Sequence, residues 1–292
     1  MEFFRSIVRA VGVGAVLWAA LAGVQAWAGL TPIQANALFT KVVSGDHAAL
    51  ATLMAEARQG NPNAQFELGL LYNNGRGVPQ DYGQAAQWYR EAAEQGIAEA
   101  QSNLGLLYAS GHGVPQDHGQ AAQWYRKAAE QEYDVAQLNL GLLYDIGQGV
   151  PQDYSQAAQW YRKAAEQGNA RAQFNLGGLY VKGQGVPQDY GQAALWWRKA
   201  AEQGHAAAQT NLGVLYENGQ GVPRNKVAAY ALYSLSAAQE SANGNHPASE
   251  NRASLTNGMS KPEIEAGQAL ARGMNAPGQL LKALDDYVAH KP

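Results

Sequence analysis

The sequence predicts an all-α fold made of repeated helix pairs between residues 61 and 240. The motif Gly-x-Gly-Val-Pro occurs five times at intervals of 36 residues, beginning at Gly75, Gly111, Gly147, Gly183 and Gly219. Between these motifs, apolar residues follow the spacing of amphipathic helices. A fixed period of this length indicates units that stack, because one helix pair cannot bury its apolar face alone. We expect five units, at 61–96, 97–132, 133–168, 169–204 and 205–240.

Residues 1–28 have the pattern of a cleavable export signal. Arg5 and Arg9 precede an uncharged apolar run from Ala10 to Val24, and Ala26-Trp27-Ala28 fits a small-x-small cleavage site. This run is shorter than the roughly 20 residues that a membrane-spanning helix needs. We therefore expect a periplasmic or secreted protein, cut after Ala28, with no membrane span after cleavage. A retained membrane anchor is the alternative.

Each unit is predicted to contain two helices, which in the first unit run roughly over Pro62–Asn74 and Tyr82–Gln95. The second helix begins with Asp81 as its N-cap, and Gln84 is placed to complete a capping box. Gly69 and its equivalents lie inside the first helix, where Gly costs roughly 1 kcal/mol relative to Ala. We expect this cost to be offset by a close approach of the second helix of the same unit.

Both flanks of the repeats are predicted to be helical caps, because an open terminal repeat would leave its apolar face in water. Residues 29–60 contain a degenerate helix pair, Ile33–Val43 and His47–Gln59. In residues 241–292, a capping-box signal at Ser260 starts a helix that ends near Gly273, and Pro277–Ala289 follows as a last amphipathic helix.

The repeats resemble a known family. Leu68-Gly69-Leu70-Leu71-Tyr72, followed by Ala85-x-x-x-Tyr89, resembles the tetratricopeptide pattern. With the 36-residue period and the ending Trp88-Tyr89-Arg90-Glu91-Ala92-Ala93, residues 61–240 are similar to the Sel1-like repeat family. The last unit departs from this pattern, since Leu232 replaces Trp. The resemblance implies a right-handed α/α solenoid that mediates protein–protein contacts and has no enzymatic activity of its own.

The composition excludes several classes of protein. The 292 residues include no Cys, which excludes disulfide scaffolds and thiolate metal sites. A net charge of −3 argues against a nucleic-acid partner. His112 and His118 are a conceivable metal pair, but their spacing is nonstandard and a third ligand is missing. We expect no metal, no cofactor and no catalytic residue, because the recurrent aspartates are explained as N-caps. The alternative, a hydrolase of cell-wall material or β-lactams, rests on resemblance to cysteine-rich family members.

The exposed face of the first helix of each unit is the candidate binding site, because repeat curvature turns it into a concave groove. One position on this face recurs as Glu67, Asn103, Asn139, Asn175 and Asn211. An amide there can donate to and accept from the backbone of an extended peptide. By resemblance, the matching position of peptide-clamping tetratricopeptide domains also carries Asn. The alternative is that each Asn bonds a neighbouring repeat or loop.

Specificity is expected from positions that vary between units on the same face, among them Arg171, Asp145 and Lys182. The expected partner is a protein or peptide, bound by a monomer of this chain. On the second helix, an Arg recurs four residues before a Glu, as in Arg90 and Glu94. This spacing predicts a solvated convex face with weak ion pairs.

Overall fold

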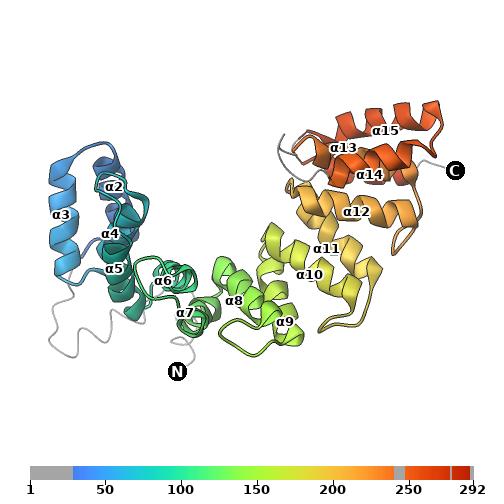
Figure 1. Ribbon diagram of the computed structural model, residues 1–292. Helices are drawn as coiled ribbons and strands as arrows, with labels where there is room; N and C mark the ends of the chain where they lie inside the picture. Colours follow the sequence, from blue (N-terminus) through green and yellow to red (C-terminus); the bar gives the residue numbers. More distant parts are fainter. Residues whose placement is uncertain (1–28, 240–246, 277, 290–292) are drawn as a thin grey trace, which may run out of the picture.

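The computed structural model describes residues 29–239, 247–276 and 278–289, so the predicted export signal lies outside the described residues. The described residues form fifteen α-helices and no strand. Figure 1 shows these helices stacked in chain order into an open arc, with the N-terminal pair at one end and the C-terminal helices at the other. The predicted all-α solenoid is confirmed.

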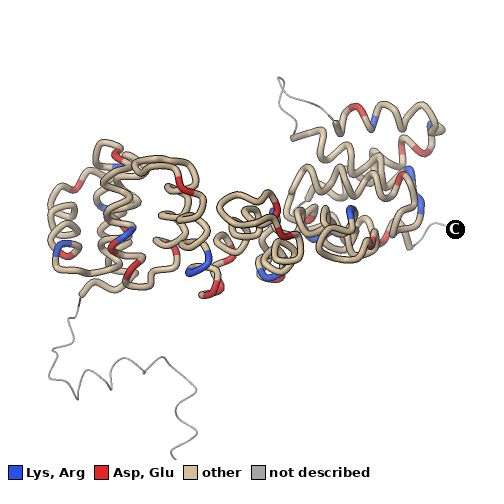
Figure 2. The backbone as a smooth tube through the Cα atoms, turned by 60° about the horizontal axis from the view of Figure 1, so that its bottom comes forward, with Lys and Arg blue, Asp and Glu red and all other residues tan. Residues whose placement is uncertain are grey.

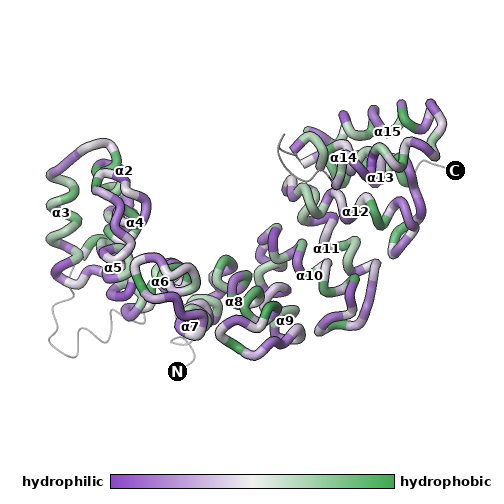
Figure 3. The backbone as a smooth tube through the Cα atoms, viewed as in Figure 1, coloured by the Kyte–Doolittle hydropathy of each residue, from purple (hydrophilic) through white to green (hydrophobic). Residues whose placement is uncertain are grey.

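Each of the five units contains two antiparallel helices, here called helix A and helix B. The A helices are α4 (Pro62–Asn74), α6 (Ala98–Ser110), α8 (Asp134–Ile146), α10 (Ala170–Lys182) and α12 (Ala206–Asn218). The B helices are α5 (Tyr82–Glu94), α7 (His118–Glu130), α9 (Tyr154–Glu166), α11 (Tyr190–Glu202) and α13 (Lys226–Ala237). Hydrophobic and hydrophilic residues alternate within each helix (Figure 3), as expected for helices that each bury one face.

Helix A and helix B of a unit contact each other at a glycine of helix A, where no side chain covers the backbone. A Cβ added to Gly69 would lie 2.4 Å from the ring of Tyr89, and one added to Gly141 would lie 2.7 Å from the ring of Tyr161. Both rings are almost completely buried. The predicted close approach of helix B is therefore confirmed. Only Gly lets the aromatic ring rest on the backbone of helix A.

Neighbouring units are joined by the loop between helix A and helix B. From the second unit on, the second Gly of the Gly-x-Gly motif packs on the first residues of the preceding helix B, and a Cβ on Gly113 would lie 2.2 Å from the carbonyl carbon of Tyr82. Gly149 has the same relation to His118, and Gly185 to Tyr154. These loop glycines also have positive φ angles, 71° at Gly113, which Gly adopts without a steric penalty. The contact to the preceding unit was not predicted.

A ladder of buried glutamines also joins the units. Gln137 of α8 donates from Nε2 to the carbonyl of Ala129 at the end of α7, over 3.2 Å. Its Oε1 accepts from Gln167, which follows α9 in its own unit, over 2.9 Å. The same pair of bonds recurs from unit to unit, with Gln65, Gln101, Gln173 and Gln209 in the place of Gln137. A carbonyl at the end of each helix B is thereby satisfied away from water.

The aspartate N-caps of the B helices are confirmed, but the capping box is not. Asp81 Oδ1 accepts from the backbone of Gly83 over 2.9 Å and of Gln84 over 3.0 Å. The backbone N–H of Asp81, which Gln84 would bond in a capping box, instead donates to the carbonyl of Tyr72 over 2.9 Å. That bond ties the start of helix B to the end of helix A, so the Gln side chain is not needed there.

The prediction of ion pairs along helix B is wrong, because the arginines reach the next unit instead. Arg90 donates to the hydroxyl of Tyr108 over 2.8 Å, and Arg162 donates to that of Tyr180 over 2.7 Å. Arg126 and Arg198 make the equivalent bonds. Figure 2 shows charged residues of both signs scattered along the tube. Spacing within one helix could not reveal a bond to a different unit.

The two ends of the solenoid are covered by further helices. At the N-terminus, α2 (Pro32–Val43) and α3 (His47–Arg58) form the predicted pair. At the C-terminus, α15 (Lys261–Met274) and α16 (Leu280–Ala289) were predicted, whereas α14 (Pro247–Thr256) was not. The last helix α16 returns to α11, where the backbone of Leu281 donates to Glu202 over 2.7 Å and Arg198 forms an ion pair with Asp285. Among the described residues, no helix has the length and apolar character needed to cross a membrane.

One backbone position yields a test of the fold. Glu132 has φ 64°, while the equivalent residues Gly96, Gly168 and Gly204 have positive φ angles without a side-chain penalty. The left-handed conformation costs about 1–2 kcal/mol for a residue with a Cβ, and Gly avoids this strain. Gly also gives the unfolded chain more conformational entropy, which offsets part of the gain in stability. We predict that Glu132→Gly raises the free energy of unfolding by about 0.5–1 kcal/mol in a denaturant titration.

The matched control for this prediction is Gln123→Gly, which places Gly at an exposed position inside α7. It should lower the free energy of unfolding by about 1 kcal/mol. A loss of stability in Glu132→Gly as well would show that the left-handed residue is not strained.

Candidate functional site

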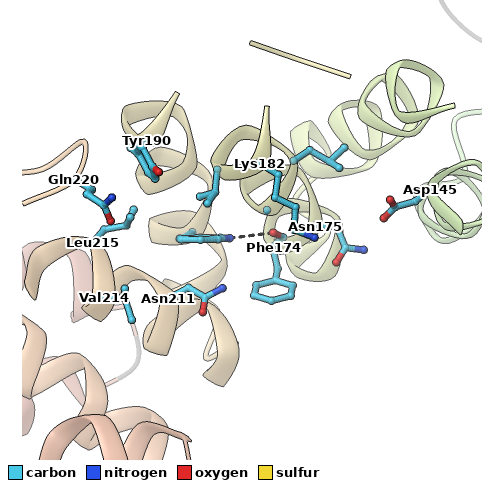
Figure 4. A pocket seen from close by; sticks show the side chains of 13 residues that line it. Asp145, Phe174, Asn175, Lys182, Tyr190, Asn211, Val214, Leu215 and Gln220 are labelled. Atoms are coloured by element: carbon cyan, nitrogen blue, oxygen red, sulfur yellow. Dashed lines mark hydrogen bonds between the residues drawn. The ribbon is translucent and has the colours of Figure 1, made fainter. Parts of the chain in front are cut away.

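The candidate site is a pocket of about 470 Å³ on the face of the A helices in the fourth and fifth units. Helix α10 supplies Phe174, Asn175, Gly178, Leu179, Val181 and Lys182 to its lining. The rest comes from neighbouring elements, namely Tyr190 and Trp197 of α11, Asn211, Val214 and Leu215 of α12, Asp145 of α8 and Gln220 of the loop after α12. Figure 4 shows Asp145 set apart from the other side chains, on the helix of the preceding unit.

Four of the eight sequence-predicted site residues line this pocket: Asp145, Asn175, Lys182 and Asn211. Asn103 and Asn139 occupy the equivalent positions of α6 and α8 and are half-buried outside it. Arg171 lies exposed near the start of α10. The pocket therefore brings together two amides, one carboxylate and one ammonium group from three successive units.

Glu67, the first member of the Asn series, has a different environment. Its side chain is only 5 % exposed, and Oε1 accepts from Nδ2 of Asn36 in α2 over 3.4 Å. The other carboxylate oxygen, Oε2, is buried without a hydrogen-bond partner among the described residues. Burial raises the pKa of Glu67 above its ordinary value, and the bond from Asn36 acts in the opposite direction. The N-terminal cap thus covers this position, which is not an open part of the groove.

Tyrosine hydroxyls of the B helices reach the groove side of the A helices. Tyr161 donates to Oδ2 of Asp145 over 3.0 Å, and Tyr233 donates to Oε2 of Glu217 over 2.7 Å. Burial is the main cause that raises the pKa of both hydroxyls above the ordinary value, so they remain protonated donors at neutral pH. The amide of Asn175 lies beside Tyr161 and acts to lower that pKa.

Some members of the Asn series therefore interact with residues of the neighbouring unit. Asn175 interacts with Tyr161 of the preceding unit, and Asn103 interacts in the same way with Tyr89. The amide of Asn211 lines the pocket and has no hydrogen-bond partner among the described residues. A structural role and a binding role are thus compatible along the series, as the sequence left open.

The floor of the pocket is aromatic because Trp197 replaces the Tyr that the other units carry. Its Nε1 donates to the backbone carbonyl of Phe174 over 3.0 Å, shown as a dashed line in Figure 4. Phe174 stacks on His205, with ring centroids 4.7 Å apart. Burial is the main cause that lowers the pKa of His205, so this ring is predominantly neutral at pH 7.

Gly178 is one of the lining residues that the sequence did not single out. The equivalent residues of the other A helices are Leu70, Leu106, Leu142 and Val214. Leu106 is 54 % exposed, whereas Leu70, Leu142 and Val214 are partly buried against the core. A Cβ on Gly178 would have no atom within 4 Å, so open space replaces the leucine side chain. The signal was present in the sequence, where Leu-Gly-Gly-Leu stands for Leu-Gly-Leu-Leu.

The charges of α10 also differ from those of the other A helices. Arg171 and Lys182 are its charged residues, whereas α4, α6, α8 and α12 carry acidic residues alone: Glu67, Glu99, Asp134, Asp145 and Glu217. No group of three or more His, Asp or Glu side chains that could hold a metal ion occurs in the part of the chain that the structure describes. The pocket is thus a mixed apolar and polar surface with one basic residue at its edge.

Comparison with known proteins identifies the repeats. The family described as Sel1 repeat matches residues 62–97, 98–133, 134–169, 170–205 and 206–241. The crystal structure of a Sel1 repeat protein from Oxalobacter formigenes is similar at 35% sequence identity and a TM-score of 0.69, covering 81% of this chain and 96% of that chain. A protective antigen of uropathogenic Escherichia coli with an SLR fold matches at 26% identity and a TM-score of 0.40, covering 95% of this chain and 82% of that one. No curated protein matches the chain.

The buried carboxylate of Glu67 yields a pH-dependent prediction. Because its pKa is raised above 4.5 in the folded protein, the folded state binds a proton more readily than the unfolded state. Stability therefore falls as pH rises from 4.5 through the higher pKa of the folded state. Glu67→Gln removes this loss and should raise the thermal midpoint at pH 7, with the difference from wild type shrinking as pH falls towards 4.5.

Thermal melts at a series of pH values measure this difference, and Glu99→Gln at an exposed position of α6 is the control. A Glu67→Gln variant that is less stable than wild type at pH 7 would show that the carboxylate is held by favourable contacts.

Proposed function

Because the chain belongs to the Sel1 repeat family, we propose that it is an exported, non-enzymatic scaffold that binds an extended segment of a partner protein in the groove of its A helices. Sel1 repeat proteins are in general non-enzymatic repeat scaffolds that mediate protein interactions. The observation that carries the proposal is the pocket in which Asn175 and Asn211, from successive units, face the same space as Lys182.

The chemistry of this pocket suits a peptide backbone. An amide can donate to a backbone carbonyl and accept from a backbone N–H. Two amides at equivalent positions of neighbouring units can therefore hold successive parts of an extended chain in one register. The aromatic floor of Phe174 and Trp197 offers apolar surface to side chains between them. The arrangement resembles other helical grooves in that few polar groups fix orientation while apolar contacts supply most of the affinity.

Export is supported by the pattern of residues 1–28, namely a basic start, an apolar run and the site at Ala26-Trp27-Ala28. Export also fits a chain without Cys, whose stability in an oxidising compartment comes from stacked helices alone.

The first test is the N-terminus of the exported protein. We predict that protein recovered from the cell envelope or medium begins at Gly29, measured as intact mass and N-terminal peptide by mass spectrometry. Replacing Ala26 and Ala28 with Gln should leave the precursor uncut, because signal cleavage requires small residues at these positions. A wild-type protein that retains residues 1–28 would contradict the cleavage proposal.

The second test addresses the groove. We predict that the Asn175→Ala, Asn211→Ala double variant captures its specific partner from an envelope extract at least tenfold less than wild type, measured by quantitative mass spectrometry. The matched control removes two exposed amides from B helices, Gln87→Ala with Gln159→Ala, and should capture as wild type does. Unchanged capture by the double Asn variant would contradict the groove assignment. Capture of no protein beyond the tag-only background would contradict the scaffold proposal.

A further inference from the structure

The fourth unit differs from the others at the positions that shape the pocket. Its A helix has Gly178 where Leu70, Leu106 and Leu142 stand in the first three units. Gly178 lines the same pocket as Val214 and Leu215 of α12 and Trp197 of α11, and a Cβ on Gly178 would point into open space. We call this space, defined by Gly178, Trp197, Val214 and Leu215, the notch.

The packing of the helices does not require a glycine at position 178. Gly69 and its equivalents are required because an aromatic ring of helix B rests on them, but a Cβ on Gly178 would meet nothing within 4 Å. Gly inside a helix costs roughly 1 kcal/mol relative to Ala. The chain carries this cost in α10 alone among its A helices, beyond the Gly that packing requires. A place for a ligand group explains this cost.

The size and lining of the notch indicate what it binds. A missing leucine side chain leaves room for an apolar group of about that size, and aliphatic and aromatic residues line the same pocket. Lys182 lies exposed on the edge of the same pocket, on the one A helix of the five repeats that carries basic residues alone. The carboxylate of Asp145 also lines the pocket, but it already accepts a hydrogen bond from Tyr161. Lys182 is therefore the charged group available to a ligand of opposite charge.

We propose that the notch is the specificity pocket of the groove, which takes a leucine-sized apolar side chain of a partner peptide whose adjacent carboxylate pairs with Lys182. This inference rests on the proposed peptide-binding function and adds the chemistry that selects the peptide. The amides of Asn175 and Asn211, which line the same pocket as the notch, orient the peptide backbone. Burial of the apolar side chain against Trp197 and Val214 supplies sequence preference.

The test uses N-acetyl-leucine as the probe, because it carries a leucine side chain next to a carboxylate. Titrated into the purified protein, it should shift the amide NMR signals of Gly178 and Val214 and reach saturation. N-acetylalanine lacks three carbon atoms of the side chain and should bind at least tenfold more weakly. N-acetyl-leucinamide, which lacks the carboxylate, should bind several-fold more weakly, and Lys182→Met should remove that difference.

The decisive variant is Gly178→Leu, which restores the residue of the first three units and fills the notch. It should weaken N-acetyl-leucine binding at least tenfold while leaving the thermal midpoint unchanged or higher, because Leu is the better helix former. Leu106→Val, a change at the same position of α6, is the control and should bind as wild type does. Equal binding to wild type and Gly178→Leu, or shifts confined to residues outside the pocket, would overturn the proposal.

Failure of this inference is distinguishable from failure of the proposed function. If Gly178→Leu leaves probe binding intact while partner capture still requires Asn175 and Asn211, the groove binds peptides without the notch. If the probe binds in the notch but no partner is captured, the notch exists and the scaffold function is wrong.

Discussion

The structure depends on one contact, the aromatic ring of each B helix resting on a bare backbone position of its A helix. In the first unit an added Cβ on Gly69 would lie 2.4 Å from the Tyr89 ring, too close for any other residue without a shift. This contact sets the spacing of the two helices and buries the ring. It also carries the hydroxyl of the ring to the groove side, where Tyr161 meets Asp145. The core contact thus decides which polar groups the groove presents.

The contacts between neighbouring units are nearly identical along the solenoid. The differences between units that bear on binding therefore lie on the groove face. The loop glycine, the glutamine ladder and the Arg–Tyr bond recur with the same partners along the solenoid. Each link ties a residue of one unit to a fixed residue of the next, so a change in any of them would alter the stacking. Positions such as Gly178 and Lys182 take no part in these links. These two positions can therefore vary without altering the stacking, and the fourth unit carries residues there that the other units lack.

The sequence predicted most of what depends on contacts within a unit, the capping box at Asp81 excepted, and missed what depends on contacts between units. Period, helix pairs, N-caps and the Gly–ring contact follow from spacing, because residues within a few turns determine them. The buried Gln137, the bond from Arg90 to the next unit and the cover that α2 places over Glu67 involve residues outside the unit. In the sequence, Gly178 is one Gly among many. Its role depends on the absence of neighbouring atoms around position 178, which only the folded structure reveals.

The central claim is that the partner binds on the A-helix face around α10. Site-specific photo-crosslinking in intact cells tests this most directly, with p-benzoylphenylalanine placed at Val181, which lines the pocket, in one strain and at Lys199, exposed on α11, in another. We expect a crosslinked partner of defined mass from position 181, with a lower yield when Gly178→Leu is added, and none from position 199. A partner crosslinked from position 199 and not from position 181 would contradict the claim, because recognition would then take place on the B helices.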